Sequence, residues 1–227
     1  MSGKYIPMKL LVVADVYGDF TTLGKIIEKA RDLNPDVVIC PGNITDMFAQ
    51  ASDFSQLDVA DIIIQKLLSL GKPVLCVPGN HDPYDIIDVF EEYGVNLHGK
   101  HRVVNNHHFI GFGGAKTPFN TPFEPSEEEV KEHLERLPNT QPLIMVTHNP
   151  PKDTKLDVVK KKHVGSLTIR EEIQKKKPLV AIAAHILEGR GVDVLDSTTL
   201  FNPGPAFKGF FGMVNIGKKV LCEKKSL

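Results

Sequence analysis

Short apolar runs alternate with longer segments of helical spacing in the first part of the chain. The apolar runs are Lys9–Ala14, Asp36–Cys40 and Pro73–Val77, and the segments with helical spacing are Phe20–Leu33, Val59–Leu70 and Pro83–Tyr93. Apolar runs without polar alternation are typical of strands that are buried on both faces of a parallel sheet. The succession of strand, helix and strand therefore predicts the parallel units of an α/β fold.

The pattern changes after Val95, where short segments alternate between apolar and polar positions as far as Gly114. This alternation predicts antiparallel strands in a second sheet. Ser126 and Glu129 stand in the positions of a capping box, which predicts that a helix begins there. The remaining helices and strands are expected at Ser126–Leu137, Pro142–Thr147, Ser166–Lys176, Leu179–Ala183, Val192–Leu195, Thr198–Phe201, Phe211–Ile216 and Lys219–Cys222.

Length and composition favour one domain over residues 1–227, with residues 1–8 as a ragged or added end. The chain has 227 residues, of which 41% are hydrophobic, and neither a linker nor a repeat divides it. Cys40 and Cys76 lie inside apolar runs, where cysteine acts as a small hydrophobe, so we expect a reducing, cytoplasmic setting. The formal net charge is -1, which predicts no general attraction to nucleic acid. No apolar stretch approaches the roughly 20 residues of a membrane helix, so we expect no membrane partner.

Five apolar runs each end in a side chain that is able to bind a metal. These side chains belong to Asp15, Asn43, Asn80, His148 and His185. The carboxyl ends of parallel strands gather at one rim of an α/β sheet, and ligands bind at that rim. We therefore expect the five side chains to line one ligand site.

The turn that contains Gly79, Asn80, His81 and Asp82 has two interpretations. In the first, Asn80 offers an amide oxygen to a metal, His81 exchanges protons near neutral pH, and the Asp82 carboxylate orients one of them. In the second, Asp82 caps a helix that begins at Pro83. Gly79 is expected to supply an unusual backbone angle to the turn.

The chain resembles the calcineurin-like metallophosphoesterases over essentially its whole length. Their pattern is Asp-x-His, Gly-Asp, Gly-Asn-His-Asp/Glu, a lone His and Gly-His-x-His, each after a core strand. It is matched in order by Asp15, by Gly79 to Asp82, by His148 and by His185. The segment around His148 is similar to the small single-domain phosphodiesterase-like branch of archaea and bacteria. The resemblance implies a four-layer α/β/β/α sandwich that hydrolyses phosphoesters with the help of metal ions.

The chain departs from the family pattern at Tyr17, Asn43 and Leu187, where the family has His, a bridging Asp and His. In the family, these three positions and Asp15 hold the first metal, so the departures imply the loss of one ion. The amide of Asn43 carries no charge to offset the repulsion between two ions, and Leu187 has no lone pair. Tyr17 would bind as a phenolate only beside a hard, highly charged ion, and otherwise its ring fills the space of the lost ion.

By the same resemblance, Asn43, Asn80, His148 and His185 form the second metal site. Their nitrogen and oxygen donors suit one weakly held divalent ion of Mn, Fe, Zn or Ni. His81 would protonate the leaving alkoxide or steady the phosphate. We therefore expect a phosphoesterase with an impaired, mononuclear centre that acts on a phosphodiester or a phosphomonoester. The alternative is a catalytically silent protein of this fold that binds a phosphorylated ligand or serves as a scaffold for a protein partner.

Four further residues are candidates for contacts with a phosphorylated small molecule. Gly165 and Ser166 open a helix whose first N–H groups suit an anion, although Ser166 also fits an ordinary N-cap. Glu188 and Arg190 follow His185 closely in the sequence. Asp46 also lies near the rim, where a role at a helix N-terminus is expected. A homo-oligomer is compatible with these features.

Overall fold

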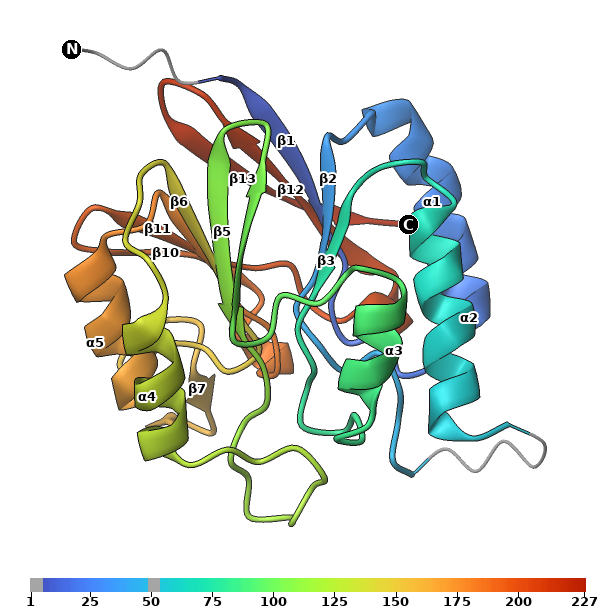
Figure 1. Cartoon of the computed structure of the whole chain (residues 1–227), viewed down its shortest axis with the longest axis horizontal. Coiled ribbons are helices and arrows are strands. Elements are labelled where there is room, and N and C mark those ends of the chain that lie inside the picture. The colour runs from blue at the N-terminus through green and yellow to red at the C-terminus, as the bar shows by residue number, and fades with distance from the viewer. Residues whose placement is uncertain (1–5, 49–53) are drawn as a thin grey trace.

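The computed structural model describes residues 6–48 and 54–227, and it forms two stacked sheets with helices on both outer faces (Figure 1). The first sheet has the order β13 (Val220–Ser226), β12 (Phe210–Ile216), β1 (Met8–Val12), β2 (Val37–Cys40) and β3 (Val74–Cys76). The second has the order β10 (Gly191–Leu195), β11 (Thr198–Asn202), β9 (Val180–Ile182), β6 (Leu143–Thr147), β5 (His107–Phe112) and β4 (Lys100–Val104). The expected four-layer α/β/β/α sandwich is confirmed.

The helices are divided between the two outer faces of the sandwich. The first sheet is covered by α1 (Phe20–Leu33), α2 (Gln56–Leu68) and α3 (Ile86–Glu92), and the second by α4 (Glu127–Arg136) and α5 (Leu167–Lys176). Short elements complete the chain: the hairpin β7 (Val158–Val159) and β8 (Lys162–His163), and the 3-10 turns η1 (Leu187–Gly189) and η2 (Ala206–Lys208). The alternation of apolar and polar residues is too brief in the hairpin for the sequence to predict it.

Three apolar layers hold the sandwich together because successive strand residues face opposite sides of a sheet. In β1, Leu11 packs against the helices of the first sheet, whereas Leu10 and Val12 pack between the two sheets. In β6, Val146 joins the layer between the sheets, and Met145 joins the layer under α4 and α5. Strands with both faces covered carry no polar alternation, which is why the sequence shows them as continuous apolar runs.

Local side-chain chemistry sets where several helices begin. Ser126 accepts a hydrogen bond from the N–H of Glu129 and receives the Glu129 side chain on its own N–H, which confirms the capping box of α4. Ser166 accepts from the N–H of Ile169 at the start of α5. Asp19 caps α1 through the N–H of Thr22. Each cap satisfies backbone donors that the first turn of a helix leaves free.

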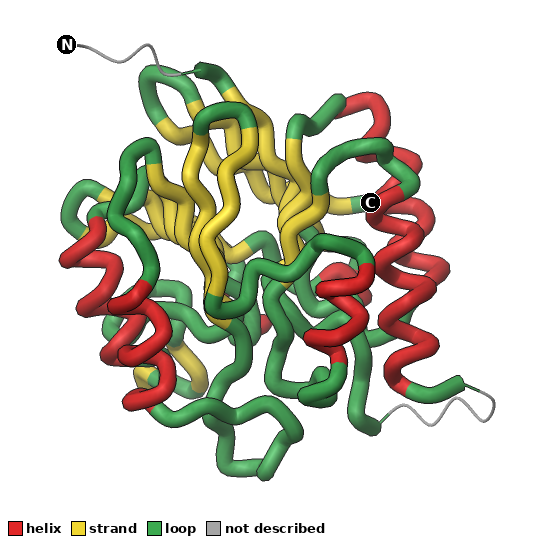
Figure 2. Tube along the Cα trace, in the orientation of Figure 1, coloured by secondary structure: helices red, strands yellow, loops and turns green. Residues whose placement is uncertain are grey.

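The parallel strands deliver their carboxyl ends to one end of the sandwich. β1, β2 and β3 are mutually parallel in the first sheet, as are β5, β6, β9 and β11 in the second. Figure 2 shows the long loops gathered below the strands at this end. The polar residues that follow the strands are therefore brought to one place by the topology.

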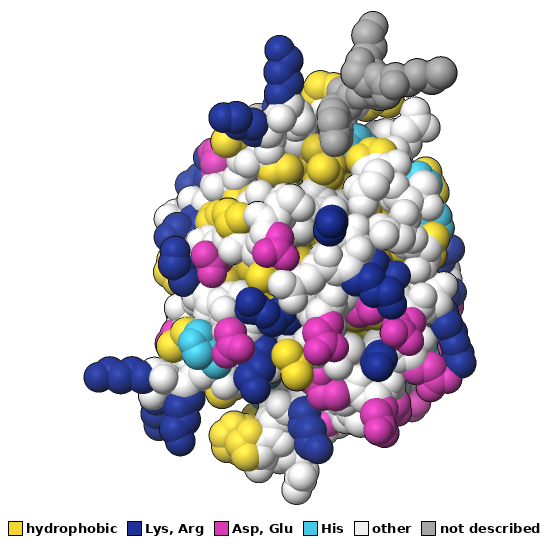
Figure 3. All heavy atoms as spheres, turned by 90° about the vertical axis from the view of Figure 1, so that its left-hand side faces the viewer, with side chains coloured by type: hydrophobic (Ala, Val, Ile, Leu, Met, Phe, Trp, Pro, Cys, Tyr) yellow, Lys and Arg dark blue, Asp and Glu magenta, His cyan; other side chains and the backbone are white. Residues whose placement is uncertain are grey.

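The outer face formed by α4 and α5 carries lysine, arginine and acidic side chains side by side (Figure 3). One lysine of this face, Lys176, is nevertheless buried, with its ammonium 3.5 Å from Glu172 Oε2 and donating to the carbonyl of Leu137. In the described part of the chain, no helix combines the length and the apolar character that a bilayer span requires.

Candidate functional site

The structure brings together the side chains that follow five of the parallel strands. Asp15 follows β1, Asn43 follows β2, Asn80 follows β3, His148 follows β6 and His185 follows β9. The first four of these side chains are buried, and close polar contacts link them and His185 across the gap between the two sheets. The rim that the sequence predicts is therefore a closely packed polar cluster.

Two glycines allow the loops of this cluster to approach one another. A Cβ atom on Gly79 would lie 2.1 Å from Asn43 Oδ1, and one on Gly42 would lie 2.5 Å from His148 Nδ1. Gly42 has a left-handed φ of 100°, whereas Gly79 does not have a left-handed φ. The expectation that Gly79 supplies an unusual backbone angle is therefore wrong, and its role is to make room for Asn43.

Four residues of the cluster adopt left-handed backbone conformations. Their φ angles are 52° at Asp15, 50° at Tyr17, 51° at Asn43 and 64° at His185. Such a conformation costs of order 1 kcal/mol or more for a residue other than glycine, and it persists only where the surroundings enforce it. The tertiary contacts of this rim therefore hold four strained residues close together, which makes the cluster the candidate functional site.

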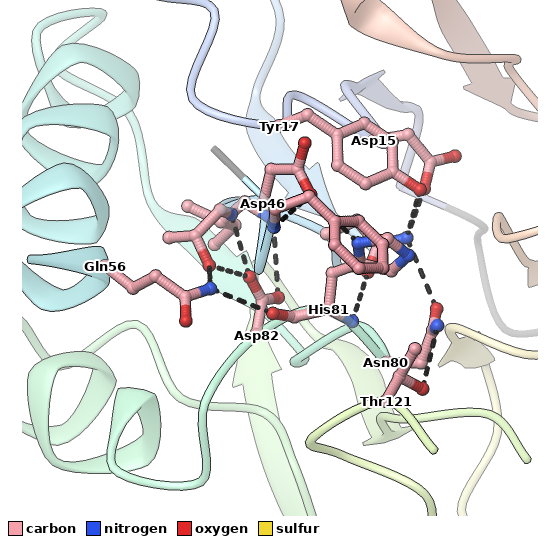
Figure 4. A network of polar contacts seen from close by, with 12 residues as sticks. Asp15, Tyr17, Asp46, Gln56, Asn80, His81, Asp82 and Thr121 are labelled. Carbon is pink, nitrogen blue, oxygen red and sulfur yellow. Dashed lines mark hydrogen bonds and ion pairs between the residues drawn. The ribbon is translucent and has the colours of Figure 1, made fainter. Parts of the chain in front are cut away.

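The amide oxygen of Asn80 lies at the centre of the cluster. Asn80 Oδ1 is 3.1 Å from His148 Nε2 and 3.0 Å from His185 Nδ1. The orientation of this amide is fixed from the other side, because its nitrogen donates to Thr121 Oγ1 at 3.1 Å. Figure 4 shows Thr121 beside Asn80, with a dashed line between the two side chains. The oxygen of Asn80 thus faces the two histidines.

Asn43 presents its amide nitrogen, and not its oxygen, to the centre of the site. The nitrogen donates to Asp15 Oδ1 at 3.0 Å and to the Tyr17 hydroxyl at 2.8 Å, and it lies 3.4 Å from Asn80 Oδ1. The oxygen of Asn43 accepts from the N–H of His81 at 3.0 Å. In this orientation Asn43 is a hydrogen-bond donor and offers no lone pair to a metal, in contrast to the amide oxygen expected from the sequence.

Burial controls the ionisation of the two acidic groups around Asn43. Burial raises the pKa of Asp15 to about 7, and the hydrogen bond from Asn43 acts in the opposite direction. Burial, together with the negative charge of Asp15, raises the pKa of Tyr17 above its usual value. The Tyr17 phenol is therefore neutral at physiological pH, which disfavours its action as a phenolate ligand.

His81 is oriented by Asp46, and not by Asp82. His81 Nδ1 lies 3.1 Å from Asp46 Oδ1. The Asp82 carboxylate is fully buried and accepts from the N–H groups of Thr45 and Gly79, both at 2.8 Å. The catalytic role predicted for Asp82 therefore has no support in its contacts, because this carboxylate joins two loops beneath the site.

Comparison of the sequence with known protein families identifies the family of this chain. The family model described as calcineurin-like phosphoesterase matches residues 8–189. The chain belongs to the calcineurin-like phosphoesterase family. An uncharacterized protein of Methanocaldococcus jannaschii is 34% identical to it over 213 residues, which cover 90% of each chain.

Two solved structures show the same fold at low sequence identity. The protein TT1561 of Thermus thermophilus has a TM-score of 0.77 at 18% identity, and the match covers 97% of this chain and 99% of the other. A protein described as a novel archaeal phosphodiesterase has a TM-score of 0.58 at 15% identity, with 97% of this chain and 100% of the other covered. The fold of this calcineurin-like phosphoesterase is thus shared with small archaeal and bacterial proteins.

Calcineurin-like phosphoesterases use divalent metals, and the residues around Asn80 fit one ion. His148 Nδ1 lies 2.7 Å from the carbonyl oxygen of Pro41, which can only accept, so Nδ1 carries the proton. Burial lowers the pKa of His148 well below its usual value, which keeps the ring neutral. The lone pair of His148 Nε2 then faces the lone pairs of Asn80 Oδ1, an arrangement that a cation between them would stabilise.

The residues of the other family site do not fit a second ion. Asp15 remains as a carboxylate, but Tyr17 is a neutral phenol and Leu187 is apolar. Across residues 6–48 and 54–227, no three or more His, Cys, Asp and Glu side chains form a group that could hold a metal. A donor set of two histidines and the Asn80 oxygen carries no negative charge, so its affinity for an ion is modest.

The structure separates the remaining predicted contact residues. Glu188 lines a groove beside the site. Gly165 donates its N–H to Asp157, and Ser166 donates its hydroxyl to Glu127, so both groups are engaged within the chain. Arg190 donates to the carbonyls of Pro203 and Lys225 and stacks over Phe210. These bonds tie Arg190 to the C-terminal strands.

Sequence reasoning missed two residues that support the site. Asp46 was expected to act at a helix N-terminus, yet its carboxylate contacts His81. Its position three residues after Asn43, at the same strand end, was a usable signal. Thr121 carried no signal, because it lies in the loop between β5 and α4 and reaches Asn80 only through the tertiary structure.

Proposed function

We propose that this calcineurin-like phosphoesterase hydrolyses a phosphoester with one divalent transition metal ion held by Asn80, His148 and His185. The observation that carries the proposal is the pair of facing lone pairs on Asn80 Oδ1 and His148 Nε2, which are 3.1 Å apart. Manganese, iron, zinc and nickel suit these donors. The family to which the chain belongs supports the reaction class, and a phosphorylated small molecule is the proposed substrate.

When bound, the ion would polarise a phosphoryl oxygen and lower the pKa of a water molecule. His81 lies beside it, and its Nδ1 is occupied by Asp46, which leaves Nε2 to face the substrate. From that position His81 protonates the leaving alkoxide. Asp46 holds the imidazole in this orientation, and the Tyr17 ring packs against its edge with ring centroids 5.1 Å apart.

We further propose that the centre is impaired. The uncharged amide of Asn43 stands where the family has a bridging carboxylate, and its nitrogen faces the centre. Leu187 adds no donor. Two-metal sites stabilise both the attacking and the leaving oxygen, whereas a single ion aids only one of them strongly. Slow hydrolysis is the physical consequence.

Metal analysis and hydrolysis of a nitrophenyl phosphoester test both parts of the proposal. The wild-type protein is expected to carry at most one ion and to hydrolyse slowly. Restoring the family residues by Tyr17→His, Asn43→Asp and Leu187→His should raise the metal content toward two ions and increase the rate. A matched control changes the exposed residues Tyr84→His, Asn105→Asp and Leu221→His, which lie outside the site.

The results would separate this proposal from the alternative of a catalytically silent protein. If neither the wild-type nor the restored protein hydrolyses the ester, but the protein binds inorganic phosphate, the results would favour a phospho-ligand binder. A scaffold would bind neither a metal nor phosphate at this rim. A restored variant with no gain in metal content or rate would count against the assignment of the site residues.

A further inference from the structure

An open groove of about 380 Å³ begins at the candidate metal ligands and extends away from them. It shares Asn80, His81 and His185 with the site. Most of its other lining residues are apolar: Pro118, Phe119, Val159, Val164, Ile186 and Leu187. Phe119 is 74% exposed and Val164 is 45% exposed, so both present apolar surface to the groove. The groove thus has a polar end at the site and an apolar wall beyond it.

Three segments that are distant in sequence build the apolar wall. Phe119 lies in the loop before α4, Val159 and Val164 lie in and beside the β7–β8 hairpin, and Leu187 follows β9. Glu124 ties the first loop together, because it accepts from the hydroxyls of Thr117 and Thr121.

The second segment, which carries Val159 and Val164, is also anchored by a carboxylate. The buried carboxylate of Asp157 accepts from the N–H groups of Thr154 and Gly165 and lies 2.7 Å from His163 Nδ1. These bonds fix both ends of the turn that carries Val164. The wall is therefore a built surface, because each of these two segments is anchored by a carboxylate behind it.

Leu187 lines the groove together with the candidate metal ligands Asn80 and His185. At this position the family pattern has a metal-binding histidine, and here the side chain lines the groove. Leu187 offers no donor to a metal and extends the apolar wall toward Asn80 and His185. A polar substrate group would gain little from such a wall, since hydroxyls placed against it lose their hydrogen bonds to water.

We propose that the groove binds the alcohol part of the phosphoester and that this part is apolar and aromatic. This inference rests on the proposed function and names its substrate class: aryl or similarly apolar phosphoesters, with the phosphoryl group at Asn80, His81 and His185. The exposed ring of Phe119 is available for stacking. A cavity of about 150 Å³ accommodates one benzene ring, so the groove has room for one or two rings. Lys116 and Glu188 also line the groove and bring one positive and one negative charge to it.

Two phosphonates test the inference without any need for hydrolysis, because their carbon–phosphorus bond is stable. Phenylphosphonate and methylphosphonate are titrated into the Mn²⁺-supplemented protein by calorimetry. Phenylphosphonate is expected to bind on the order of tenfold more tightly, because its ring leaves water for the apolar wall. Phe119→Ala and Val164→Ser should bring the two affinities close together and leave that of methylphosphonate unchanged. Val194→Ser, at a valine that is 63% exposed and does not line the groove, is the matched control.

Equal affinities for the two phosphonates in the wild-type protein would overturn the inference. So would a preference that survives both groove substitutions, or the binding of neither phosphonate. Failure of the groove inference can be distinguished from failure of the proposed function. Hydrolysis of nitrophenyl phosphoesters without a preference for phenylphosphonate would refute the groove and retain the enzyme. A preference without hydrolysis would support the groove and count against the enzyme.

Discussion

The side-chain nitrogen of Asn43 donates a hydrogen bond to Asp15 Oδ1 at a distance of 3.0 Å. The same nitrogen donates to the Tyr17 hydroxyl at 2.8 Å, so one amide group satisfies two neighbours that in the family pattern surround a cation. A neutral donor thereby takes the place of a positive charge beside a buried carboxylate. Asp15 and Tyr17 thus have a hydrogen-bond partner that does not depend on a cation.

Asn43→Asp is expected to destabilise the metal-free protein and to make it respond to metal. The new carboxylate would lie beside the buried Asp15 carboxylate, and the donor between them would be lost, at a cost of about 2 kcal/mol or more. Thermal unfolding measures both effects. Without metal, the unfolding midpoint of the variant should lie below that of the wild type. On addition of Mn²⁺, the midpoint of the variant should rise by more than that of the wild type. The exposed Asn105→Asp is the control. An Asn43→Asp protein with wild-type stability and no added metal response would contradict this account.

Thr121 is expected to control metal affinity through the orientation of Asn80. Thr121→Val removes the acceptor of the Asn80 amide, so the amide can rotate and present its nitrogen to the ion. Loss of such an outer contact typically lowers metal affinity by about 10- to 100-fold. Thr121→Ser keeps the hydroxyl and should bind Mn²⁺ nearly as tightly as the wild type. Calorimetric titration with Mn²⁺ compares the two variants, and equal affinities would show that Thr121 does not position the ligand.

Asp82 is expected to matter for stability and not for the chemical step. Asp82→Ala leaves the N–H groups of Thr45 and Gly79 buried without an acceptor, which should cost about 3 kcal/mol or more. Urea unfolding measures this loss. Asp85→Ala is the matched control, because Asp85 is exposed and makes no side-chain cap bond at α3. An Asp82→Ala protein with wild-type stability and abolished hydrolysis would restore the catalytic interpretation.

His98 is expected to make the protein sensitive to acid. Burial, with a smaller contribution from His133, lowers the pKa of His98 to about 4, and its Nδ1 accepts from the N–H of Gly113. The unfolded chain takes up this proton near pH 6.5, so the stability due to a neutral His98 is complete above pH 6.5 and is lost as the pH falls toward 4. The loss is at most about 3 kcal/mol.

Denaturant unfolding between pH 7 and pH 4 checks this expectation. His98→Asn keeps an acceptor but does not titrate, so its free energy of unfolding should fall less steeply with acid than that of the wild type. His163→Asn should change the slope in the opposite direction, because Asp157 raises the pKa of His163 and thus favours the folded state at low pH. Identical slopes for the wild type and His98→Asn would exclude His98 as a source of acid sensitivity.

Much of the architecture follows from the sequence because burial on both faces of a strand leaves a continuous apolar run. Phe20–Leu33 is recovered without error as α1, since Asp19 and Asn34 mark its ends. The residues at the strand ends, such as Asp15 and His185, are likewise found from the sequence, because the topology of parallel strands brings such positions together. The β7–β8 hairpin is missed because a two-residue strand has no period to detect.

The sequence by itself determined the succession of strands and helices and the set of polar residues at the strand ends, since both depend on periodic patterns and on position along a strand. Its resemblance to a family implied the four-layer sandwich. Only the tertiary structure decided how those residues are used. Asn43 turns its nitrogen inward because the N–H of His81 takes its oxygen, and Asp82 turns away from the site because the backbone of Thr45 requires it. Leu187 becomes a groove wall only beside Val164. The orientation of an amide or a carboxylate depends on partners from distant loops, and a sequence does not display those partners side by side.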